Sequence, residues 1–315
     1  MLRLIGRRLL LMLPTLVLAS ILIFALAEVL PGDVGRTVLG IYASEAEVAA
    51  LNRELGADRP LVVRYATWAG SFVTGDWGDS PIQKIPVRPL VMQALGNSLI
   101  LAGFALVLIV PVSITLGVFS GLRRDSWMDR TITVSTLSMT VIPEFVSGVV
   151  LLYIFAVWLK WFPVSALPPD GSPFYDRLYY LILPAIPLMF LELGYIARMA
   201  RVGTVQVLAM PYIRTAVLKG VPRSRVIFGH VLRNAMVPTV TVIGSQVGWL
   251  IGGLVVVETL FAYPGIGKLM VDAAQSSDVP LLEASVLMVA VIYMLANLIA
   301  DIVVALLNPR IRKGG

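Results

Sequence analysis

Long apolar stretches alternate with polar segments along this chain of 315 residues. A transmembrane helix needs about 20 mainly apolar residues to cross about 30 Å of hydrocarbon, and a helix satisfies its own backbone hydrogen bonds in lipid. Stretches of this length, with polar turns taken as boundaries, cover residues 9–30, 97–121, 131–159, 179–197, 239–257 and 284–307. The pattern therefore predicts an all-α integral membrane protein with about six transmembrane helices.

Two features modify this prediction. Pro143 lies in the third stretch and Pro184 and Pro187 lie in the fourth, which favours kinks or early helix ends there. The first stretch follows three arginines, as the core of a signal peptide does. It is longer than such a core, which has roughly 7 to 15 residues, and no small-x-small site follows Leu30. We therefore expect it to be a transmembrane helix.

The composition independently indicates a membrane protein. Hydrophobic residues make up 58% and charged residues 14% of the chain, and its mean hydropathy is +0.87, whereas charged residues make up about 25% of a typical soluble domain. The chain has no cysteine and one histidine, His230. This excludes disulfides, thiolate metal sites and sites with several histidines, so we expect neither a metal nor a cofactor on this chain.

The basic residues predict the orientation. With six spans, the N-terminus, residues 122–130, residues 198–238 and the C-terminus share one side, which holds most of the 25 lysines and arginines. Asp125 and Asp129 are the only acidic residues of these segments. The positive-inside rule makes this side cytoplasmic. The net charge of +6 thus reflects topology and is not evidence for nucleic-acid binding, because the charges flank membrane spans.

These boundaries divide the chain into four parts. They are a cytoplasmic N-terminus with the first span (1–30), an extracytoplasmic segment (31–96), a core of five spans that includes the loop 198–238 (97–310), and a cytoplasmic tail (311–315).

The extracytoplasmic segment contains two recognisable elements. Ser44 and Glu47 form a capping-box pattern, and Gly56 is placed to end the short helix that follows. Further along, an aromatic series predicts an amphipathic element at the membrane interface; it consists of Trp68, Phe72 and Trp77. This region either shields the mouth of a pore or offers a docking surface for a binding protein.

A second outer element, residues 261–268, contains glycines and a lysine but is not a phosphate-binding loop. The pattern for such a loop fails at Ala262 and at Leu269. The sequence therefore gives no evident ATP site.

Glycine spacing predicts close helix contacts. Gly244, Gly248 and Gly252 recur every four residues, which puts them on one helical face where a neighbouring backbone can approach. Gly117 and Gly121 repeat this spacing. Such faces serve packing within the chain, a subunit interface or a sliding pore surface.

Polar residues inside the spans or near their ends are candidates for the transport pathway, because an ionisable group is costly in lipid and tends to face the bundle interior or water. The candidates are Glu144, Gln246 and Glu258. Glu144 directly follows a proline, so it either marks a helix break or lines the pathway. For Glu192 we expect a local pairing with Arg198 or Arg201.

The loop 198–238 carries seven cations and no acid. Residues 212–218 contain no helix breaker, Gly220 can end a helix in the left-handed conformation, and Pro222 prevents its continuation. Residues 226–236 then predict a second amphipathic helix. The loop is either a retention signal that meets lipid headgroups or a compact knob that a partner protein holds.

The residues of this loop carry a resemblance. They are Tyr212-Ile213-Arg214-Thr215-Ala216 with Lys219-Gly220, then His230, Arg233-Asn234-Ala235 and Pro238. This series resembles the EAA loop of ABC-importer permeases of the dipeptide/oligopeptide/nickel (DppB/OppB-like) family. Further motifs in the family's order make the resemblance cover nearly the whole chain: Leu30-Pro31-Gly32-Asp33, Gly75-Asp76-Trp77-Gly78, Ile142-Pro143-Glu144-Phe145, Leu183-Pro184-Ala185, Glu258-Thr259, Phe261, Tyr263-Pro264-Gly265-Ile266-Gly267 and Leu307-Asn308-Pro309-Arg310-Ile311-Arg312.

The resemblance implies a type I ABC-importer fold and a permease that forms half of a translocation path in a bacterial cytoplasmic (inner) membrane. The implied partners are a second, DppC-like permease, an extracytoplasmic substrate-binding protein and two cytoplasmic ATPases, which would hold ATP and Mg. Coupling to the ATPases is assigned by the resemblance to Tyr212, Arg214, Thr215, Ala216, Lys219 and Gly220. A structural brace of the loop is assigned to His230, Arg233, Asn234 and Pro238.

The chain departs from the family pattern at two places. Pro211 stands where an acidic residue is usual. The loop of the family usually reads Ala-Arg-Ala-Lys-Gly where this chain has Ala216-Val217-Leu218-Lys219-Gly220. Both departures change the charges offered to an ATPase.

The resemblance also bears on cargo, which the binding protein mainly selects. Di- and oligopeptides are the leading expectation, with nickel chelates, opines, glutathione and sugars as alternatives. A self-sufficient channel or secondary carrier is the other class of function. Carriers commonly show inverted repeats, no internal repeat is visible here, and a cytoplasmic knob has no role in a carrier. A membrane enzyme is not favoured, because no set of catalytic groups lies at compatible depth.

The predicted orientation is testable with single cysteines, since the chain has none of its own. Cysteines at Ser44 and Ser172 should react with a membrane-impermeant thiol reagent in intact cells, whereas a cysteine at Ser224 should react only after lysis. Labelling of the Ser224 variant from outside would contradict the six-span topology.

Overall fold

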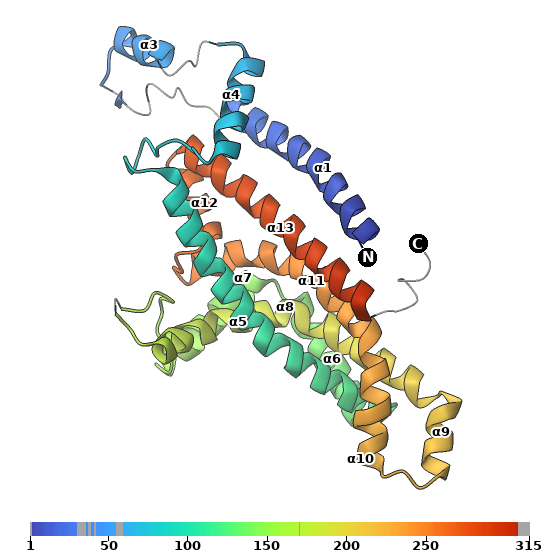
Figure 1. Ribbon diagram of the computed structural model, residues 1–315. Coiled ribbons are helices and arrows are strands. Elements are labelled where there is room, and N and C mark those ends of the chain that lie inside the picture. Colours follow the sequence, from blue (N-terminus) through green and yellow to red (C-terminus); the bar gives the residue numbers. More distant parts are fainter. Residues whose placement is uncertain are drawn as a thin grey trace. The chain divides into compact units, whose positions relative to one another are not determined.

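The computed structural model describes residues 2–29, 36, 39–40, 42–54, 59–169 and 171–307, and these are built from helices (Figure 1). No strand occurs in these ranges; Asp79 and Pro86 form an isolated bridge. The helices are α1 (Leu2–Val29), α3 (Glu45–Glu54), α4 (Leu61–Thr74), α5 (Val87–Leu122), α6 (Trp127–Val141), α7 (Glu144–Leu151), η1 (Leu152–Trp158), α8 (Phe174–Leu208), α9 (Pro211–Leu218), α10 (Arg223–Arg225), η2 (Val226–Leu232), α11 (Arg233–Leu260), α12 (Ile266–Gln275) and α13 (Val279–Leu307). The helix end expected at Gly56 and the motifs at 30–33 and 308–312 lie outside the described residues.

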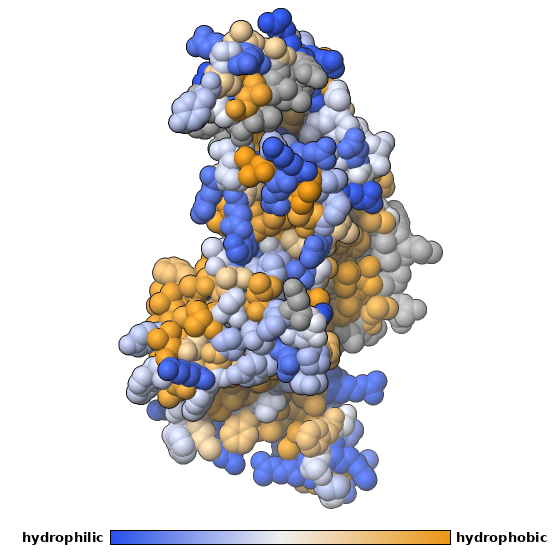
Figure 2. All heavy atoms as spheres, turned by 90° about the vertical axis from the view of Figure 1, so that its left-hand side faces the viewer, coloured by the Kyte–Doolittle hydropathy of each residue, from blue (hydrophilic) through white to orange (hydrophobic). Residues whose placement is uncertain are grey.

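Five helical stretches of the described chain are long and apolar enough to cross a membrane. They are Arg8–Ala27, Val87–Leu122, Phe174–Leu208, Arg223–Leu260 and Val279–Val303. A sixth results if the bent pair Trp127–Val141 and Glu144–Trp158 is counted as one span. Hydrophobic residues cover broad areas of the surface in Figure 2, as expected for helices that face lipid. The prediction of an all-α membrane protein is confirmed.

The third predicted span is not one continuous helix. Its two helices meet at a bend of 100°. Ile142 and Pro143 have extended backbone, with ψ of 122° and 142°, because a proline disfavours helical geometry in the residue before it. Glu144 therefore occupies the first turn of α7 and follows a true helix break.

The fourth predicted span differs in the opposite way. Helix α8 continues through Pro184 and Pro187 and extends past residue 197 to Leu208. Both prolines are buried, so packing around them offsets the two missing backbone hydrogen bonds. The expected helix end at these prolines is wrong, and the first part of the loop 198–238 is helix.

The described residues fall into two compact units. One contains Leu99–Tyr263 and segments near both chain ends; the other contains Gly6–Ser98 with Pro264–Met294.

In the second unit, side-chain hydrogen bonds connect loops to the first turns of helices. The Ser44 hydroxyl and NH both donate to Glu47 Oε2, at 2.7 and 2.9 Å, and Ser44 Oγ accepts from the Glu47 NH. These bonds confirm the capping box and hold the pKa of the Glu47 carboxyl below its usual value. Asp278 Oδ1 accepts from the Leu281 NH at the start of α13, and its other oxygen accepts from Ser80.

The predicted aromatic series is also present in this unit. Phe72 and Trp77 are stacked with ring centroids 4.7 Å apart, and Trp68 lies 5.9 Å from Phe72 and 5.6 Å from Phe24 of α1. No residue of α4 is buried. The aromatic series therefore joins α4 to the C-terminal part of α1 through ring contacts.

In the first unit, α5 packs on α8 through glycine. A Cβ placed on Gly117 would overlap the carbonyl oxygen of Ala197, and one on Gly121 would lie 2.8 Å from Thr204 Cβ. The predicted face of small residues on α5 is thus used for packing within the chain.

This contact predicts a sharp difference between two glycines of α5. Gly117→Ala should destabilise the chain by about 1–3 kcal/mol, because the added methyl group meets a backbone oxygen that cannot rotate away. Gly103→Ala, at a position with nothing within 4 Å, should not destabilise it. Heat denaturation of both variants in detergent measures this, and equal midpoints would contradict the packing.

Candidate functional site

The segment between α8 and α11 forms a compact structure, which we call the knob (residues 209–232). Helix α9 begins with Pro211, at the first helical position, where a missing NH costs nothing. It ends at a turn in which Gly220 has φ of +74° and the Val221 NH reaches the Ala216 carbonyl at 3.2 Å. Pro222 then precedes α10. The helix and its glycine stop are as predicted; the return segment differs, because residues 226–232 are π-helical.

The knob has its own apolar core. Ile213 of α9 packs with Val226 and Val231 of the return segment and with Val207 and Ala235 of the flanking helices. Ala216 is half-buried against the same cluster. Its side chain therefore contributes to packing within the chain.

A polar brace holds α9 to the start of α11. Asn234 Nδ2 donates to Tyr212 Oη at 2.9 Å and to the His230 carbonyl at 2.8 Å. The rings of Tyr212 and His230 pack edge to face, 6.5 Å apart. Beside them lies a groove of about 360 Å³ that Tyr212, Asn234 and Pro238 line together with residues of α8. Of the four residues predicted to form a brace, His230 and Asn234 are in contact, Pro238 lines the groove beside Asn234, and Arg233 is exposed.

The outer face of the knob is exposed and mixed in character. Leu218 is 79% and Phe228 71% exposed, and Val217 is exposed as well. Around them lie exposed cations, namely Arg214, Lys219, Arg223 and Arg225, and residues 198–238 contain no acid. An exposed apolar surface surrounded by charges of one sign is typical of a contact for another protein.

The three pathway candidates lie in different surroundings. Glu258 is fully buried in α11 and Glu144 is half-buried at the start of α7. Gln246 donates to Glu192 Oε2 at 2.6 Å, and Glu192 is only 1% exposed. The expected pairing of Glu192 with Arg198 or Arg201 is wrong, because Glu192 points to α11 and Arg201 binds a different carboxylate.

The glycine series of α11 is used only in part. A Cβ on Gly244 would lie 2.8 Å from Ala300 Cβ of α13, and Gly248 is buried. Gly252 has nothing within 4 Å, whereas its neighbour Gly253 lies against Leu188 and Leu191 of α8. The contact of α11 with α8 at this level is therefore made by Gly253 and not by the predicted Gly252.

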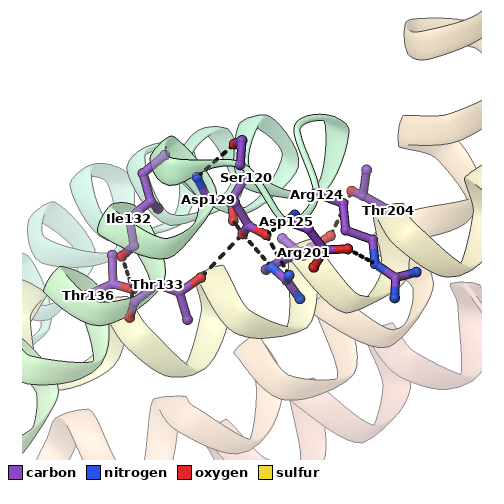
Figure 3. Close-up of polar contacts among 11 residues, drawn as sticks. Ser120, Arg124, Asp125, Asp129, Ile132, Thr133, Thr136, Arg201 and Thr204 are labelled. Atoms are coloured by element: carbon purple, nitrogen blue, oxygen red, sulfur yellow. Dashed lines mark hydrogen bonds and ion pairs between the residues drawn. The ribbon is translucent and has the colours of Figure 1, made fainter.

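One polar cluster was missed by sequence reasoning. Asp129 of α6, counted only as a charge opposing the cations, is 2% exposed and accepts hydrogen bonds from Arg201 of α8 (Figure 3). Its sequence signal is Ser126, whose Oγ accepts from the Asp129 NH at the start of α6 in the Ser-x-x-Asp pattern of a helix N-terminus. The partner on α8 has no such local signal.

The chain is similar to known membrane proteins of transport systems. Residues 113–313 match the family described as binding-protein-dependent transport system inner membrane component, and residues 1–86 match its N-terminal counterpart. The chain is similar to the oligopeptide transport system permease protein AppB of Bacillus subtilis (38% identity over 97% of this chain and 98% of the relative). It is also similar to the probable peptide ABC transporter permease protein y4tP of Sinorhizobium fredii (35%, 97% and 98%) and to the glutathione transport system permease protein GsiC of Escherichia coli strain K12 (36%, 99% and 99%).

The Glu192–Gln246 contact predicts opposite effects for two substitutions. Glu192→Gln should leave stability unchanged or raise it, because it removes a buried carboxylate that has one oxygen without a hydrogen bond. Gln246→Leu should lower stability by about 1–3 kcal/mol, because it leaves the carboxyl without its donor. Denaturation in detergent, with the exposed Gln275→Leu as control, measures both. Equal destabilisation by Glu192→Gln and Gln246→Leu would show that the carboxylate has another essential partner.

Proposed function

The chain belongs to the family of binding-protein-dependent transport system inner membrane components, with the type I ABC-importer permease fold, and we propose that it forms half of the path by which an ATP-driven importer moves di- or oligopeptides across the bacterial cytoplasmic membrane. The main support is the outer face of the knob, because it combines exposed leucine and phenylalanine with cations and no acid. Both termini and the knob lie on the cytoplasmic side in this proposal, as the positive-inside rule favours.

Separate ATPases bind the knob and so drive the transporter. Tyr212, Arg214, Thr215 and Lys219 are exposed on α9 and its turn and supply the contact surface. Ala216 acts from within, by letting α9 lie close to the core of the knob, and Gly220 allows the turn. ATP-driven closure of two ATPases then displaces α9, and the pore alternates between inward-facing and outward-facing states.

Three further partners complete the importer. A second, similar permease supplies the other half of the path, and an extracytoplasmic binding protein delivers the cargo to the side that carries α3 and α4. ATP and Mg are held by the ATPases, because the pattern at residues 261–268 lacks the features of a phosphate-binding loop.

Peptides are the favoured cargo. Two of the similar permeases are named for peptide or oligopeptide transport and one for glutathione, which is itself a small peptide. Because the binding protein selects the cargo, the ligand that copurifies with that protein identifies it, and a cargo that is not peptide-like would contradict this part of the proposal.

The role of the knob in import can be tested by substituting two glycines of the same loop, Gly220 and Gly229. Gly220 has φ of +74°, whereas Gly229 does not have a positive φ, and a Cβ added at either glycine would have no atom within 4 Å. Gly220→Val should distort the end of α9 at a cost of about 1 kcal/mol or more and abolish import, whereas Gly229→Val leaves the turn intact and should retain it. Import and ATP hydrolysis of the reconstituted complex are the measurements.

A surface variant separates docking from folding. Leu218→Asp keeps the knob's core but puts a negative charge on its exposed face, so the ATPases should be lost or their hydrolysis should no longer drive import. Normal import by both Gly220→Val and Leu218→Asp would contradict the assignment of the knob as the site at which the ATPases bind and move the permease.

A further inference from the structure

The carboxylate of Asp129, on α6, accepts hydrogen bonds from α5, from the α5–α6 turn and from α8 (Figure 3). Arg201 of α8 donates to it through Nε at 2.6 Å and Nη2 at 2.7 Å. Ser120, near the end of α5, donates to the same carboxylate, as does the Asp125 NH of the α5–α6 turn at 2.8 Å. Both carboxylate oxygens therefore have donors, and the bidentate pair fixes the orientation of α8 as well as its distance from α6.

The same stretch of α8 is in backbone contact with its neighbours. Gly117 and Gly121 bring α5 against Ala197 and Thr204, on either side of Arg201 in sequence. The α5–α6 hairpin thus holds the segment 197–204 by close packing and by the ion pair, and a helix held in both ways cannot slide or rotate without breaking one of them.

The knob is attached to the continuation of this segment. A Cβ on Gly203 would lie 2.5 Å from the Ala235 carbonyl of α11, and Val207 belongs to the apolar core of the knob. Segment 197–207 of α8 therefore contacts the α5–α6 hairpin at its N-terminal end and the core of the knob at its C-terminal end.

We propose that Asp129 and Arg201 are positioning residues for transport, which pass a displacement of the knob along α8 to α6. Helix α6 ends at the 100° break before Glu144, so a rotation of α6 moves the helix pair at that break. The proposal rests on the proposed function, since it requires an ATPase that displaces the knob. Neither residue touches cargo or nucleotide. Their role is to keep the number of ATP molecules hydrolysed per cargo imported low.

A purely stabilising role makes a different prediction. If the pair only held the fold together, its loss would reduce the amount of assembled complex, and import and ATP hydrolysis would fall together. A positioning role predicts that assembled complexes still hydrolyse ATP while importing less, so the number of ATP molecules hydrolysed per cargo imported rises.

The test uses the complete transporter in proteoliposomes, with activities expressed per assembled complex. Asp129→Asn and Arg201→Met should raise the ratio of ATP hydrolysed to cargo imported by about tenfold. Arg201→Lys keeps the charge but loses the bidentate geometry, so it should fold and should raise the ratio by a smaller factor. Arg124→Met is the matched control, because Arg124 forms an exposed ion pair with Asp125 in the same turn; its ratio should equal that of the wild type.

The outcomes separate the two proposals. If the wild type imports with ATP and Arg201→Lys and Asp129→Asn keep the wild-type ratio, the positioning role is refuted and the proposed function stands. If Asp129→Asn or Arg201→Met does not assemble, Arg201→Lys alone decides, and an unchanged ratio in it refutes the inference. A wild-type complex that imports nothing with ATP overturns the proposed function and, with it, this inference.

Discussion

Backbone contact between α8 and its neighbours is the constraint on which the first unit depends. A Cβ on Gly117 of α5 would meet the Ala197 carbonyl, one on Gly194 would meet the Thr136 carbonyl of α6, and one on Gly203 would meet the Ala235 carbonyl of α11. In lipid the hydrophobic effect does not drive helices together, so dispersion contacts and hydrogen bonds must do so. Glycine at each crossing allows the closest approach and therefore the largest contact.

Polar side chains on the faces of α8 add direction to this packing. Thr140 of α6 accepts from the Gly194 NH and donates to the Phe190 carbonyl, Gln246 of α11 donates to Glu192, and Arg201 binds Asp129. Each bond fixes the position of α8 along its neighbour, whereas apolar contacts alone would allow the two helices to slide past each other. Helix α8 is thereby held to α6 at two levels and to α11 at one, as the proposed transmission of a movement along α8 requires.

The features that depend on local rules were predictable from the sequence, and those that depend on two helices were not. Gly220 ends α9 and Pro143 breaks the third span, as predicted. Helix α5 begins at Val87, before the predicted span 97–121, and its first turns pack in an apolar cluster with α12 and α13. Glu192 was expected to bind an arginine of its own helix, but helix rotation turns it to α11, and Arg201 finds a carboxylate on α6. A carboxylate and a guanidinium on one helix need no pairing if each has a better-placed partner across a helix contact.

The two faces of α9 show how one short helix meets two demands. Ile213 and Ala216 pack in the knob's own core with residues of the return segment. Tyr212, Val217 and Leu218 are exposed, and their contact with the rest of the chain includes the bond from the Asn234 amide to the Tyr212 hydroxyl. A substitution on the inner face therefore changes the packing of the knob, whereas one on the outer face leaves its apolar core unchanged. Ala216 is assigned to coupling by its place in the loop motif, and its half-buried side chain also packs against the knob's core.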